Sequence, residues 1–143
     1  MAIRIPTNQV VNLQQMEAVV AGPDGANRLF AVTGQLDVNL NAFSGGTTQQ
    51  TQTFTVLIGP VLTRQQFFRA ICTASIAKTT LQVQTPGNNS TCGITTSDAD
   101  WDDESGQVEL RIEVSVSSNG GTNNFAGINS LAFQVTILAA VAA

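Results

Sequence analysis

Residues 107–118 read QVELRIEVSVSS, and the strict alternation of this stretch decides the fold class of the chain. Large apolar residues occupy every second position, namely Val108, Leu110, Ile112, Val114 and Val116. Polar and charged residues fill the positions between them. A period of two residues is that of a β-strand, whose side chains point alternately to its two faces. The stretch therefore predicts a strand of an antiparallel sheet, with one face in the core and the other in water.

Similar alternation recurs along the chain. It is clear in LAFQVTI at 131–137 and in FAVTGQLDVNL at 30–40. Weaker patterns predict strands at about residues 9–20 and 52–59, and GPDGAN at 22–27 has the proline and glycines of a tight turn. The inward-facing residues of the clearest strands are predicted to form the core, namely Leu110, Ile112, Val114, Phe133 and Val135.

One segment, TRQQFFRAICTASIAK at 63–78, fits two structures. Thr63 and Gln66 have the spacing of a helical capping box, and several apolar residues after them recur at helical spacing. From Phe67 onward, however, apolar residues also recur at every second position. We favour a strand from Phe67, because the surrounding sequence is β, and a short helix remains the alternative.

The overall composition is that of one folded domain. The chain has 143 residues, of which 43% are hydrophobic, and no repeat or linker divides it. About seven to eight strands separated by turn residues are typical of a β-sandwich. We therefore predict a single all-β domain over residues 1–143, an antiparallel β-sandwich, jelly-roll-like or immunoglobulin-like, with little helix.

Charge and missing residue types argue against several functions. The net charge is −4 and Lys78 is the one lysine, so no cluster of cations is available for nucleic-acid phosphates or an anionic membrane surface. There is no histidine, which excludes Ser-His and Cys-His nucleophiles. Cys72 and Cys92 lack the spacing of zinc ligands, and without a secretory leader we expect free thiols. We predict a protein that is not an enzyme and has no cofactor; a carboxylate hydrolase is the least favoured hypothesis.

An acidic stretch, SDADWDDE at 97–104, precedes the first strand described above. Asp98, Asp100 and Asp102 have the spacing of calcium ligands in an EF-hand loop, but Asp103 occupies the position where that loop needs glycine. A non-helical calcium site on these three carboxylates is one hypothesis. The favoured interpretation is an acidic solvated loop that leads into the strand.

Three aromatic residues are candidates for binding a ligand or partner. Trp101 could stack on a sugar between its acidic neighbours, although we favour an indole that turns inward and closes one end of the sandwich. Phe43 and Phe125 lie in polar loops, where each either tucks under its loop or anchors a partner.

The chain ends and the scarcity of charge favour assembly. Only 11% of residues are charged, and the segment from 131 to the C-terminus carries no charge. If strand 131–138 lies at a sheet edge, another chain should cover it. We therefore predict a homo-oligomer, or a protein bound to a capsid or other protein lattice, whose chain ends take part in the contact.

The leading functional hypothesis is a virion structural protein, such as a phage capsid decoration or cement protein, made in the host cytoplasm. The absence of a signal peptide and of a catalytic set supports it, as does the polar, weakly charged surface. The alternative is a small lectin-like or adhesin-like sandwich that uses Trp101, Phe43, Phe125 and the acidic loop, in the cytoplasm or secreted without a leader.

Overall fold

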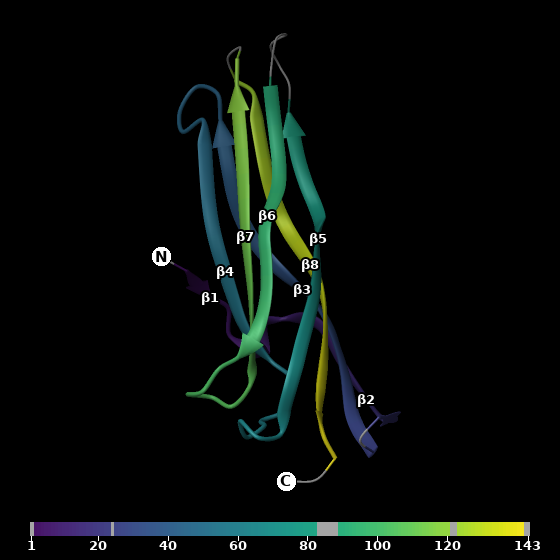
Figure 1. The fold of residues 1–143 in the computed structure, drawn as a ribbon. Coiled ribbons are helices and arrows are strands. Elements are labelled where there is room, and N and C mark those ends of the chain that lie inside the picture. The colour runs from purple at the N-terminus through teal and green to yellow at the C-terminus, as the bar shows by residue number, and fades with distance from the viewer. Residues whose placement is uncertain (1, 24, 83–88, 121–122, 142–143) are drawn as a thin grey trace.

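The computed structural model describes residues 2–23, 25–82, 89–120 and 123–141, and nearly all of them belong to β-strands (Figure 1). In chain order the elements are β1 (Ile3–Arg4), the 3-10 turn η1 (Thr7–Gln9), β2 (Val11–Gly22), β3 (Gly25–Phe43), β4 (Gln49–Ile58), β5 (Phe67–Gln82), β6 (Asn89–Trp101), β7 (Val108–Asn119) and β8 (Phe125–Ala140). No α-helix occurs in the described part of the chain.

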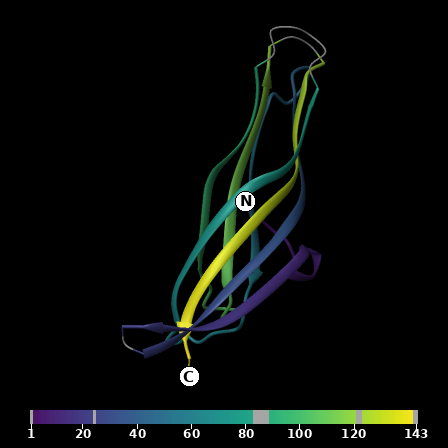
Figure 2. The same ribbon diagram turned by 90° about the vertical axis from the view of Figure 1, so that its right-hand side faces the viewer.

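The strands form two four-stranded sheets that pack face to face. Sheet A has the order β1-β4-β7-β6, and sheet B has the order β2-β3-β8-β5. Every pairing is antiparallel except that of the short β1 with β4. Figures 1 and 2 show the long strands of both sheets running along the same elongated body. The predicted antiparallel β-sandwich is confirmed.

The core lies between the sheets and is built from the alternation seen in the sequence. All five residues predicted to be buried are at most 4% exposed, namely Leu110, Ile112, Val114, Phe133 and Val135. They join one cluster with the inward residues of β3 and β4. The face assignment of both strands is therefore correct.

Segment 63–78 is a strand from Phe67 onward, as favoured, and the capping-box residues close a single turn before it. The backbone N–H of Thr63 donates to the side-chain oxygen of Gln66 at 2.8 Å, and the backbone N–H of Gln66 donates to the Thr63 hydroxyl at 3.3 Å. The helix does not continue, because β5 pairs with β8 along its length. This pairing turns alternate side chains of β5 toward the core, where they pack.

The acidic stretch is not a loop over its whole length, which corrects the sequence interpretation. Residues up to Trp101 belong to β6, where Asp98 and Asp100 stand opposite Arg111 and Glu109 of β7. Only 102–107 form the turn. β6 was not recognised from the sequence, because Ser, Thr, Gly and Asp dominate it and a register shift between Ile94 and Thr96 interrupts its alternation.

The apolar C-terminal strand is not at an edge, which corrects a second expectation. β8 lies between β3 and β5, and its pairing extends to Ala139 and Ala140. Ala139 is fully buried. Neighbouring strands of the same chain thus cover this segment, so its lack of charge is explained by its central place in the sheet and is no argument for assembly.

Candidate interaction surfaces

Trp101 closes one end of the sandwich, in agreement with the favoured interpretation. Its indole N–H lies 3.1 Å from the carbonyl oxygens of both Leu62 and Gly106, so it ties the β4–β5 connection to the β6–β7 turn. The Arg64 guanidinium lies 5.7 Å from the ring centroid, within cation–π range. A cleft of about 310 Å³ beside the indole is also lined by Phe68 and Asp100.

The three carboxylates proposed as calcium ligands have different environments. Asp98 and Asp100 alternate with the half-buried Ala99 on β6, so they project from the outer face of sheet A. Asp102 instead belongs to the turn, where it binds Ser105. Among the described residues, no group of three or more Asp, Glu, His or Cys side chains is gathered closely enough to hold a metal ion. The calcium site stays a hypothesis from the sequence.

Asp102 has a local structural partner. Its Oδ2 accepts a hydrogen bond from the Ser105 hydroxyl at 2.7 Å and another from the Ser105 backbone N–H at 3.0 Å. These two hydrogen bonds hold the pKa of the Asp102 carboxyl below its ordinary value, because they favour the charged form. The carboxylate therefore stabilises the β6–β7 turn that follows Trp101.

Phe43 and Phe125 lie together at the end of sheet B far from Trp101. They stand directly opposite each other in the β3–β8 register. The Phe43 ring packs against Gly45, where a Cβ atom would come within 2.8 Å of it, and the Phe125 ring lies over Gly127. Each ring is therefore partly tucked against its own chain, while 38% of Phe43 stays exposed.

The aromatic candidates do not form one surface. Phe67 at the start of β5 lies in the cleft beside Trp101, whereas Gln82 at its end pairs with Phe125. At a rise of about 3.3 Å per residue, β5 separates these two ends by roughly 50 Å. A single ligand site that combines Trp101 with Phe43 and Phe125 is therefore not assembled by this fold.

The outer face of sheet A carries most of the described charged side chains on the two sheets. Register places five of them on adjacent positions of β6 and β7, namely Asp98, Asp100, Glu109, Arg111 and Glu113. Arg4 of β1 donates to Glu109 at 2.7 Å. Four carboxylates against two arginines leave this face acidic, in keeping with the net charge of −4.

The outer face of sheet B is different. Three successive cross-strand rows, each read from β5 through β8 and β3 to β2, define it: Arg69, Leu138, Leu29 and Ala18; Ile71, Thr136, Ala31 and Met16; Thr73, Gln134, Thr33 and Gln14. The intervening rows contain the buried Phe30 and Ile137, so these three rows point to solvent. Arg69, at one corner, is the one charged member of these three rows, whereas Asp37 and Lys78 stand opposite Ser130 farther along the same strands. Ile71 is 59% exposed and Met16 is 71% exposed.

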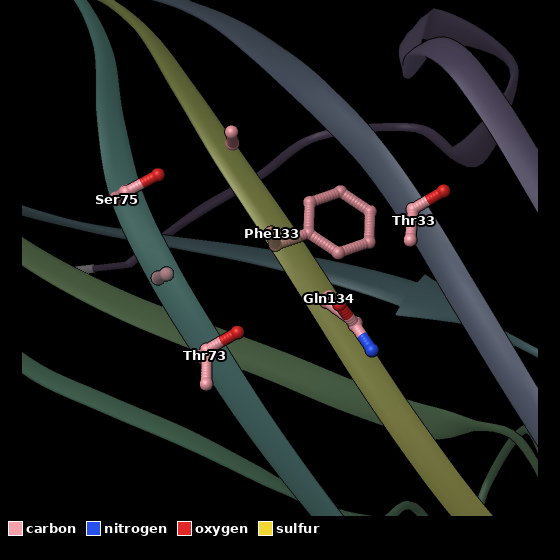
Figure 3. Close-up of a pocket in the computed structure, with 7 residues that line it drawn as sticks. Thr33, Thr73, Ser75, Phe133 and Gln134 are labelled. Carbon is pink, nitrogen blue, oxygen red and sulfur yellow. The ribbon is translucent and has the colours of Figure 1, made fainter.

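Shallow hollows lie along this outer face of sheet B. One hollow has a volume of about 260 Å³. Figure 3 shows Thr73 and Ser75 on β5, Gln134 on β8 and Thr33 on β3 around it. Another, of about 220 Å³, is lined by Met16, Glu17, Ala18, Leu29 and Ala31. Small side chains leave these hollows open, so the face offers broad contact area without a deep cavity of the kind that holds small ligands.

Both cysteines are free and half-buried, on different strands. Burial raises the pKa of the Cys72 thiol, and a hydrogen bond with Ser97 partly opposes this. Burial also raises the pKa of Cys92. The Cys72–Ser97 contact further shows that β5 and β6, the edge strands of different sheets, lie side by side.

Sequence analysis did not identify Met16, Leu29 and Ile71 as surface residues. The available signal was an apolar residue at an outward-facing position of β5 or β3, where the alternation predicts a polar one. Reading that signal requires the inward face to be known first, and β2 gives no such reference because it is exposed on both faces.

Comparison with protein-family models found no match, and neither the curated proteins nor the solved structures that were searched gave a match. Over the described ranges, the chain forms no helix with the length and apolar character needed to cross a membrane. The candidate site thus rests on geometry alone.

Proposed function

We propose that this protein is a non-enzymatic structural protein that assembles through protein–protein contacts on the outer face of sheet B. The observation that carries the proposal is the contrast between the acidic outer face of sheet A and the three rows on the outer face of sheet B, which hold exposed Ile71 and Met16 and only one charged residue. Apolar side chains gathered on a surface poor in charge are typical of protein contacts. Assembly as a homo-oligomer or on a larger lattice follows from this face.

The setting that we propose is a virion, where the chain would decorate or cement a capsid. Support comes from the composition, which has few charged residues and no histidine, and from the β-sandwich fold. This setting predicts that the gene lies beside genes for capsid and portal proteins. A gene neighbourhood devoted to carbohydrate use would instead favour the binding-module alternative.

The test of assembly places a charge in the middle of the face. Ile71→Glu should weaken self-association by about tenfold or more, because the carboxylate would lose its water in the contact. Val61→Glu is the matched control, since Val61 is 72% exposed but lies in the β4–β5 connection. Sedimentation velocity over a concentration series measures both variants. A wild-type protein that stays monomeric at high micromolar concentration would contradict self-assembly.

A carbohydrate-binding module is the second candidate, and the cleft beside Trp101 favours it. Phe68 and the indole supply aromatic surface, and Asp100 and Arg64 supply hydrogen-bonding groups. The assembly proposal ranks first because Arg64 already lies over the indole. Trp101 is the one tryptophan, so its fluorescence reports sugar binding directly. A saturable shift with an oligosaccharide, lost in Arg64→Ala and Phe68→Ala, would support this candidate.

A further inference from the structure

The free edge of β2 is the least protected strand edge in the described part of the fold. β5 and β6 lie side by side, and β1 covers part of the edge of β4. β2 pairs only with β3, so along its other side alternate backbone N–H and C=O groups have no strand partner. Exposed edges of this kind readily pair with another strand.

The sequence of β2 carries few of the features that usually prevent such pairing. From Val11 to Gly22 it contains no proline and one charged residue, Glu17. Its apolar side chains are exposed on both faces, with Met16 on the outer face and Val19, 65% exposed, on the inner one. Figure 1 shows this hairpin of β2 and β3 projecting to the side, away from sheet A. An edge that is long, apolar and uncovered needs a partner strand to protect it.

The charge distribution favours a second copy of the same chain. Glu17 is balanced by Arg28 of β3, with 3.8 Å between Oε1 and Nη1. The surface around β2 is therefore close to neutral, whereas the excess acid lies on sheet A and in the turn after Trp101. Two copies that carry −4 each repel least when they meet along this neutral edge.

We propose that β2 pairs with β2 of a second copy about a two-fold axis, so that two sheets B join into one continuous eight-stranded sheet. This inference rests on the proposed assembly function and adds a second contact to it, at the β2 edge of sheet B, distinct from the outer-face contact that Ile71→Glu tests on β5. A two-fold axis perpendicular to the sheet makes the two β2 strands antiparallel and leaves the outer faces of both copies on the same side of the joined sheet. The same edge is then complementary to itself. The outer faces of both copies then form one continuous apolar surface.

Register follows from the regular part of β2. Pairing with β3 is uninterrupted from Gln14 to Gly22, and a register shift precedes it. Centring the two-fold axis on Ala18 uses this whole segment. Centring it on Glu17 would oppose two carboxylates, and centring it on Met16 would pair fewer regular residues. In the Ala18 register, Ala18 faces its own copy and Glu17 faces Val19 of the partner.

Cysteine cross-linking tests this register directly. In a Cys72→Ala, Cys92→Ala background, Ala18→Cys should give a disulfide-linked dimer under copper–phenanthroline oxidation, because opposed residues of paired strands lie at Cα separations that a disulfide spans. Ala31→Cys is the matched control on the same outer face. Three strand spacings of about 4.8 Å would separate its two copies, beyond the reach of a disulfide.

Charge at position 19 provides a second test that misfolding cannot imitate. Val19→Lys should strengthen the dimer and Val19→Glu should weaken it, with dissociation constants about tenfold apart, because each copy brings Glu17 against residue 19 of the other. Within one chain Val19 pairs with Arg28, so stability of the fold should change in the opposite sense. Sedimentation velocity and denaturant unfolding measure the two effects separately.

The outcomes separate this inference from the proposed function. Cross-linking of Ala18→Cys without Ala31→Cys supports edge pairing. Cross-linking of Ala31→Cys without Ala18→Cys would mean that only the outer faces meet, which overturns edge pairing and leaves assembly standing. Edge pairing is also overturned by an oligomer that cross-links at neither position, or whose dissociation constant does not change with the charge at position 19. A monomer at every concentration contradicts both edge pairing and self-assembly, and leaves binding to a capsid or other lattice as the remaining form of the proposed function.

Discussion

The side chains of Trp101 and Asp102 show how single residues close one end of this sandwich. Trp101 joins two connections through one indole N–H, and Asp102 holds the turn beside it through Ser105. Both residues were candidates for ligand binding from the sequence. The indole N–H of Trp101 and Oδ2 of Asp102 are instead engaged within the chain, which favours a structural role at this end.

Asp102 should contribute acid-dependent stability. Its pKa is lowered in the folded protein, so its contribution is complete above the ordinary aspartate pKa of about 3.9 and is lost as the pH falls below it. Asp102→Asn should flatten the fall in the free energy of unfolding between about pH 5 and 3. Asp103→Asn is the control, since Asp103 is exposed and adjacent. Urea unfolding across this range measures the slope, and equal slopes in both variants would contradict the role of Asp102.

The strands differ in how far their own sequences explain them. β7 and β8 alternate cleanly because each has one face in the core. β2 is exposed on both faces and β6 is interrupted by a register shift, so neither shows a clear period. Position within the sheet, rather than intrinsic propensity, accounts for the difference.

The end of β8 should be essential to the fold. Ala140 accepts a hydrogen bond from Arg28 Nε at 2.9 Å and donates its N–H to the Gln66 carbonyl at 2.8 Å, and Ala139 is buried. Deleting residues 139–143 should therefore lower the free energy of unfolding by about 2 kcal/mol or more. Deleting 141–143 is the control and should cost clearly less. Denaturant unfolding compares them; equal losses would mean that the β8 end is dispensable.

At the scale of the whole molecule, charge is segregated between the two sheets. The acidic outer face of sheet A and the outer face of sheet B, whose three apolar rows hold only Arg69 as a charged residue, give the sandwich two surfaces of different character. A molecule built in this way can associate through one surface while the other keeps copies apart.

Association should therefore strengthen with salt. The proposed contacts carry little net charge, whereas the net charge of −4 on each copy opposes their approach, so screening removes more repulsion than attraction. Sedimentation velocity at about 20 mM and 500 mM salt tests this. Weaker association at high salt would indicate a contact made by ion pairs, which points to sheet A. The control is Ile71→Glu, whose association should remain weak at both concentrations.

The chain sequence by itself determined the all-β class, the strands at 30–40, 108–116 and 131–137, and which of their faces is buried. These properties follow from the local alternation of side chains across a strand. Even the strand starting at Phe67 could be favoured over a helix on this basis.

Tertiary structure alone decided which strands are central and which are at an edge. The uncharged segment from 131 would need a cover if it lay at an edge, but β3 and β5 flank it; β2, predicted only as a strand at about 9–20, has the free edge. The exposed apolar residues Met16 and Ile71 share one row of the outer face only because β3 and β8 join their strands into one sheet. Pairing depends on contacts between residues far apart in the chain, and the period within one strand contains no information about its neighbours.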